Sequence, residues 1–144
     1  MAIMSNPMAT RPHSIEEIAR RTTGNELAFD VGVREFIDAW QSLRTEQKKA
    51  ALTAEPRRIG RVKDAYLAAL AEHLALSDRI SVPAWTEQPD RFLSEPYFAG
   101  GLESLKAILL VESPLAFRRR LIFISADGLS RPDRTMREAV TPAP

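Results

Sequence analysis

The stretch that decides the fold is RVKDAYLAALAEHLAL, residues Arg61–Leu76. One apolar stripe runs along it at helical spacing, formed by Val62, Tyr66, Leu70 and Leu74. Residues four apart lie on the same side of an α-helix, and the alanines and leucines beside the stripe favour helix. The pattern therefore predicts a long helix with one side packed against the rest of the protein.

Three shorter helices are predicted before this one. The first opens with a capping box, in which the hydroxyl of Ser14 accepts from the amide three residues on and Glu17 reaches back. The third begins with Thr45 as its N-cap and is terminated by Pro56. The expected ranges are residues 14–22, 30–42 and 45–54.

After the long helix comes PAWTEQPDRFLSEPYFAGG (residues 83–101), with three prolines, two glycines and four aromatic residues. This composition predicts an ordered loop with a short helical turn near Asp90–Leu93. A further helix is expected over Leu102–Glu112, and a last one that starts at Ser113 and Pro114. Only Leu121–Ser125 is rich in β-formers, and one strand cannot make a sheet.

These patterns predict an all-α fold, a compact multi-helix bundle with an ordered Pro/aromatic-rich loop and flexible termini. The 144 residues, 44% hydrophobic and 27% charged, suit one globular domain. The expected organisation is a flexible arm over residues 1–12, a single helical domain over 13–130 and a flexible tail over 131–144.

Several enzyme signatures are missing from the sequence. Gly100 and Gly101 lack the spacing and the lysine of a phosphate loop, and no serine has the context of a nucleophile elbow. His13 and His73 are the only histidines, and cysteine is absent. No catalytic residue, metal ligand or cofactor is therefore expected, and a small enzyme is the least favoured class. The absence of cysteine and of a signal-peptide pattern favours a cytoplasmic protein.

A basic stretch precedes the long helix, and it is the candidate nucleic-acid site. Its cations are Arg57, Arg58, Arg61 and Lys63. A solvated helix start is the favoured explanation, although cations in a first turn oppose the helix dipole. The segment Ile15–Phe29 has some features of a helix-turn-helix, but its glycine comes one residue late and its second helix starts with acidic residues. DNA binding therefore stays the second hypothesis.

A protein-partner surface is the first hypothesis. The aromatic residues of the loop either pack it onto the core or form an interface, where tryptophan, tyrosine and arginine are enriched. Three consecutive arginines on a helix spread over about 200°, so they cannot all face one partner. At least one is expected to pair with a carboxylate of the same domain, such as Glu103 or Glu112, and the rest to contact the partner. The predicted partner-binding residues are Trp85, Phe92, Phe98, Arg118, Arg119 and Arg120.

Four blocks carry a resemblance to a known family. They are REFIDAW (Arg34–Trp40), YLAALAEHLAL (Tyr66–Leu76), VPAWTEQPDRFL (Val82–Leu93) and GGLESLKAILLVESPLAFRRRLIFISADGLSR (Gly100–Arg131). In these blocks the sequence resembles a family of small bacterial antitoxin-like proteins that are encoded beside nucleotidyltransferase-type toxins. The resemblance brings no catalytic residue with it.

The resemblance implies a protein that neutralises a cognate nucleotidyltransferase-type toxin by protein–protein contact. In that mechanism Trp85 or Phe98 would anchor the contact, and an arginine would reach carboxylates of the toxin. Changing Arg119 to glutamate is then expected to weaken the complex without loss of helix. The alternative that stays open is a DNA-binding transcriptional regulator, which could act on its own promoter.

Overall fold

The computed structural model describes residues 11–22, 26–99 and 112–125, and of residues 26 and 27 it describes only the backbone. Within these ranges the protein is mainly helical, as predicted. In chain order the elements are α1 (Ile15–Thr22), α2 (Glu26–Trp40), α3 (Thr45–Thr53), α4 (Arg61–Ser77), the 3-10 turns η2 (Ala84–Glu87) and η3 (Pro89–Arg91), β1 (Tyr97–Phe98), α6 (Leu115–Arg118) and β2 (Ile122–Phe123).

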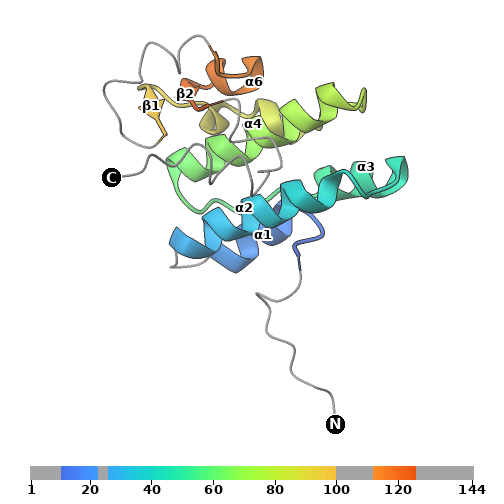
Figure 1. The fold of residues 1–144 in the computed structure, drawn as a ribbon. Helices are drawn as coiled ribbons and strands as arrows, with labels where there is room; N and C mark the ends of the chain where they lie inside the picture. Colours follow the sequence, from blue (N-terminus) through green and yellow to red (C-terminus); the bar gives the residue numbers. More distant parts are fainter. Residues whose placement is uncertain (1–10, 23–25, 100–111, 126–144) are drawn as a thin grey trace, which may run out of the picture.

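Helix α4 is the central element of the fold. Figure 1 shows α1 and α2 below it, and α6 with the two strands above it. One side of α4 meets α2, where Phe29 packs edge-on against Tyr66 with ring centroids 5.8 Å apart. The same Tyr66 packs edge-on against Phe117 of α6 at 5.1 Å. The predicted amphipathic helix therefore lies between two layers that both pack against it.

Local capping signals locate the short helices well. The hydroxyl of Ser14 accepts the amide of Glu17 at 3.0 Å, and the Glu17 carboxylate accepts the amide of His13 at 2.8 Å. The Ser14 cap is confirmed, and Glu17 reaches back as predicted, but to the amide of His13, one residue before the N-cap. At α3, however, Arg44 is the N-cap and Thr45 is the first helical residue, so the predicted cap is one residue late. The Gln47 side chain accepts the Arg44 amide instead.

The chain leaves α4 through Arg79, a residue with a left-handed backbone conformation that is not glycine. The amide of Ile80 donates to the Ala75 carbonyl at 2.8 Å and that of Arg79 to Leu76 at 3.3 Å, the bonding pattern of a Schellman motif. Arg79 has φ 58°, a conformation that its Cβ disfavours and that glycine adopts freely.

Replacing Arg79 with glycine is therefore expected to raise the free energy of unfolding by about 0.5–1 kcal/mol. Arg79→Ala is the control, because it removes the exposed side chain and keeps the Cβ. Urea unfolding of both variants measures the effect. A glycine variant no more stable than the alanine variant would show that the left-handed turn carries no strain.

The loop after α4 differs from its prediction in two ways. Instead of one turn near residues 90–93 it contains the turns η2 and η3, both held against α4. It also ends in β1, which pairs in parallel with β2 in the register Tyr97 to Ile122 and Phe98 to Phe123. The expectation that the β-rich segment would find no partner strand is therefore wrong.

The last helix is much shorter than predicted. Its cap is Pro114 rather than Ser113, and it closes after a single turn at Arg118. Leu121 then takes the left-handed conformation, with φ 62°, and turns the chain into β2. Of the predicted helix over Leu102–Glu112 all but Glu112 lies outside the described residues, as do the first ten residues of the arm and the whole tail.

Candidate functional site

The three consecutive arginines have three different environments. Arg118 is exposed at the end of α6, Arg119 lies at the edge of the protein, and Arg120 is fully buried with 0% exposure. The difference arises because α6 stops at Arg118 and the next two residues form a turn that leads inward. The run is therefore not a continuous basic patch.

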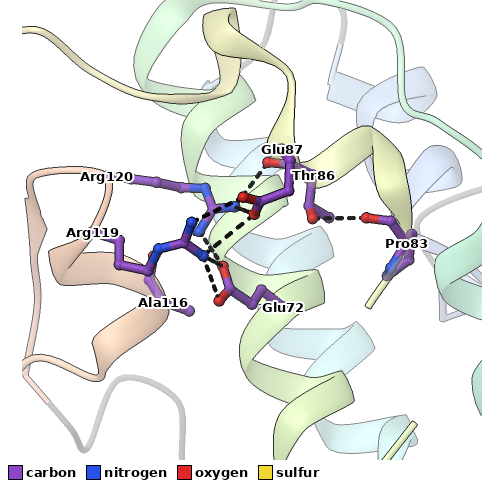
Figure 2. Close-up of polar contacts among 7 residues, drawn as sticks. All are labelled: Glu72, Pro83, Thr86, Glu87, Ala116, Arg119 and Arg120. Atoms are coloured by element: carbon purple, nitrogen blue, oxygen red, sulfur yellow. Dashed lines mark hydrogen bonds and ion pairs between the residues drawn. The ribbon is translucent and has the colours of Figure 1, made fainter. Parts of the chain in front are cut away.

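Arg120 joins three separate parts of the chain, as Figure 2 shows. Its Nη1 atom donates to Glu72 of α4 at 2.5 Å and to the Ala116 carbonyl of α6 at 2.8 Å. Its Nη2 atom donates to the Thr86 carbonyl of η2 at 2.8 Å. A guanidinium supplies five donors in a fixed plane, which lets one side chain fasten several elements at once.

Arg119 bridges two carboxylates in the same cluster. Nη1 donates to both oxygens of Glu72 at 2.8 and 2.7 Å, and Nη2 donates to Glu87 at 2.9 Å. The bond from Arg119 holds the pKa of Glu87 below its ordinary value, and the pKa of Arg119 is raised in turn by Glu87 and Glu72. We call Glu72, Glu87, Arg119 and Arg120 the arginine–glutamate cluster.

The cluster confirms that part of the arginine run pairs inside the domain, but with other glutamates than predicted. Glu103 lies outside the described residues, and Glu112 is exposed and makes no ion pair with a described residue. Glu72 follows Ala65 and Ala68 at helical spacing and precedes Ala75, all buried. A lone carboxylate on this face of small residues was the sequence signal for a buried ionic contact.

The aromatic residues of the loop are integrated into the core to different degrees. The Phe92 ring lies against both arginines, 5.5 Å from the guanidinium carbon of Arg119 and 4.5 Å from that of Arg120. Trp85 is buried, and its indole N–H donates to the Leu52 carbonyl at 2.9 Å. Phe98 is half-buried and stacks on Phe123 of β2 at 5.1 Å.

This placement separates the six predicted partner-binding residues. Arg120 is fully buried, which differs from the predicted partner contact, and Trp85 is buried except where it lines the open cavity described below. Phe92 and Phe98 are half-buried by internal contacts. Arg118 and Arg119 are the exposed residues of the set.

The four cations of the predicted nucleic-acid site have internal contacts in most cases. Arg58 pairs with Glu55 and Asp90, and these carboxylates raise its pKa. Arg61 donates to the Ser94 hydroxyl at 3.0 Å, and the Lys63 ammonium lies 5.8 Å from the centre of the Phe29 ring. Arg57 is exposed. Arg58 in particular joins the segment between α3 and α4 to the loop after α4, and two carboxylates already compensate its charge.

An open cavity of about 500 Å³ lies between α3 and residues 80–85. Its lining is mostly apolar and includes Leu52, Val82 and Trp85, and Lys49 is the charged residue among the described ones that line it. His73 lies elsewhere, half-buried against Phe117 of α6, and burial lowers its pKa. Neither place brings together an acid, a base and a nucleophile.

Two kinds of feature are absent from the described ranges. No group of three or more histidine, aspartate or glutamate side chains stands close enough to hold a metal ion there. No helix in those ranges has the length and apolar character needed to span a bilayer.

Comparison with known protein families, with curated proteins and with solved structures found no match to this chain. The family resemblance of the sequence therefore stays a prediction. The structure brings three of the four sequence blocks of the resemblance into contact, since Glu72, Glu87 and the pair Arg119 and Arg120 each come from a different block.

Proposed function

We propose that this protein is an antitoxin-like protein that binds a nucleotidyltransferase-type toxin and neutralises it by protein–protein contact. The proposal takes the class of partner from the sequence resemblance. The structure supports this mode of action, a contact between protein surfaces, because several large apolar side chains are exposed.

The observation that carries the proposal is the distribution of exposed apolar side chains. Leu76 of α4, Tyr97 of β1 and Leu115 of α6 have 53%, 41% and 59% of their surface accessible. Among the described side chains of α1, α2 and α3, no large apolar residue is exposed to this degree. The exposed ones lie on α4 and on the elements of the layer that covers it on the α6 side (Figure 1). A protein partner that docks on this side of the molecule would bury these side chains.

The contacts of the basic loop favour this proposal over DNA binding. A nucleic-acid site needs cations that neutralise phosphates, and binding then falls steeply with salt. Arg58 is already neutralised by two carboxylates, and Arg61 is engaged with Ser94. Within the described part of the basic stretch, Arg57 is the cation for which the structure gives no ion pair or hydrogen bond.

The experiment is co-expression of the tagged protein with the nucleotidyltransferase-type protein that the resemblance places in the neighbouring gene. We expect the two to co-elute at a fixed ratio in 300 mM salt, and growth that the second protein arrests to recover. Separate elution together with unrelieved growth arrest would contradict the proposal. Retention of promoter DNA that is lost with rising salt, without a protein partner, would instead support the regulator.

A further inference from the structure

Helix α6 presents two side chains on its exposed side. Leu115 and Arg118 are three residues apart, so they are neighbours on one helical turn, and both are exposed. Ala116 and Phe117 between them are buried. We call the exposed pair Leu115 and Arg118 the α6 face.

The backbone under the α6 face is held firmly. The Phe117 ring packs against Tyr66 of α4, and the arginine–glutamate cluster fixes the turn that follows. On the other side of the turn, the Ser113 hydroxyl exchanges two hydrogen bonds of 2.9 Å with the backbone of Ile124. A surface fixed before binding loses little conformational entropy when a partner docks.

The charge of the α6 face is not neutralised by its neighbours. Glu72 and Glu87 are both engaged by Arg119 and Arg120. No described residue forms an ion pair with Arg118, and the exposed Glu112, six residues earlier, makes none with it. An exposed cation beside an apolar side chain is complementary to a surface that offers carboxylates next to an apolar depression.

We infer that the α6 face is the contact through which the protein docks, and that its occupant is an acidic surface of the protein partner. Leu115 supplies apolar area and Arg118 pairs with a carboxylate of that surface. This inference rests on the proposed function, because the partner it names is the toxin-type protein of the preceding section. Of the three arginines predicted to bind the partner, it keeps Arg118, because Arg119 and Arg120 are engaged internally.

The test measures the dissociation constant of the purified complex by calorimetry for Arg118→Glu, Arg118→Gln and Leu115→Ala. We expect Arg118→Glu to weaken binding by at least about 10-fold, and each of the other two by about 3- to 30-fold. Arg34→Glu is the matched control, because Arg34 is an exposed arginine on α2, in the opposite layer, and should change binding less than 2-fold. All four variants should keep the melting temperature of the parent protein, since the altered side chains are exposed.

Salt dependence tests the charge of the occupant. Binding of the parent protein should weaken as salt rises from 50 to 500 mM, and the Arg118→Gln complex should weaken less. A complex that forms normally with every α6 variant would overturn the inference and leave the proposed function standing. A parent complex insensitive to salt would overturn the acidic occupant. If the parent protein forms no complex at all, the proposed function fails and the inference fails with it.

Discussion

Replacing Glu72 with glutamine is expected to lower the free energy of unfolding by about 3–5 kcal/mol, the usual cost of removing one partner from a buried ion pair. Arg120 is fully buried, so its charge would stay inside the protein without its closest carboxylate. Glutamine would offer Arg119 one acceptor oxygen in place of two and no charge, while the bond to Glu87 would remain. Urea unfolding monitored by circular dichroism measures the difference.

Glu46→Gln is the matched control for this prediction. Glu46 is also on a helix and also faces a cation, Lys49 at 3.6 Å, but 87% of its side chain is exposed. An exposed pair of this kind contributes little, so the change should stay within about 0.5 kcal/mol. Equal effects of the two substitutions would show that the cluster does not stabilise the fold.

A double variant separates the loss of the ion pair from the cost of leaving Arg120 buried without its carboxylate. Glu72→Met with Arg120→Met replaces the charged pair by apolar side chains of similar length and leaves no unpaired buried charge between them. The double variant is expected to be more stable than the sum of the single effects predicts, by about 1–3 kcal/mol. Additive effects would mean that the two side chains act independently, which their 2.5 Å contact opposes.

The part of this fold that follows from local patterns is the part that the sequence predicts well. Helix α4 was predicted at Arg61–Leu76 and runs over Arg61–Ser77, because its apolar stripe is long and regular. Helix α1 begins after the Ser14 capping box. The start of α2, at Glu26 rather than near Asp30, was missed because the apolar spacing becomes regular only from Val33 onward.

The C-terminal part depends on contacts between distant residues. A helical continuation through Arg119 and Arg120 is locally reasonable, but β2 pairs with β1, which lies 25 residues earlier in the chain. That pairing and the left-handed turn at Leu121 end α6 after one turn. The partner of the arginines was missed for the same reason, since Glu72 is 47 residues from Arg119 and no local pattern joins them.

In the candidate site, too, the features set by local geometry were predicted, and those set by contacts between distant residues were missed. The sequence correctly predicts that the three arginines do not act together, because consecutive residues on a turn point in different directions. It could not tell which of them is exposed, since burial is decided by the position of α4 under α6. Trp85 was offered as a partner anchor on composition alone, and the structure uses its indole to join the loop to α3 instead.

Phe117→Ala is expected to cost about 3–5 kcal/mol of unfolding free energy, because it removes a fully buried ring and leaves a cavity under α6. The ring is the apolar attachment of α6 to α4, in contact with Tyr66 at 5.1 Å and with the half-buried His73 at 6.2 Å. The arginine–glutamate cluster is the polar attachment of the same turn. With one attachment gone, the turn that carries Leu115 and Arg118 is held by the other alone.

Phe98→Ala is the matched control, since it removes the same ring from a half-buried position stacked on Phe123, and should cost about 1–2 kcal/mol. Unfolding in urea gives both values, and amide exchange of residues 115–121 reports whether α6 loosens before the whole protein unfolds. We expect faster exchange there in Phe117→Ala and no change in Phe98→Ala. If Phe117→Ala costs no more than Phe98→Ala and leaves exchange at α6 as it was, then the polar cluster alone holds the turn, and Glu72→Gln should release it.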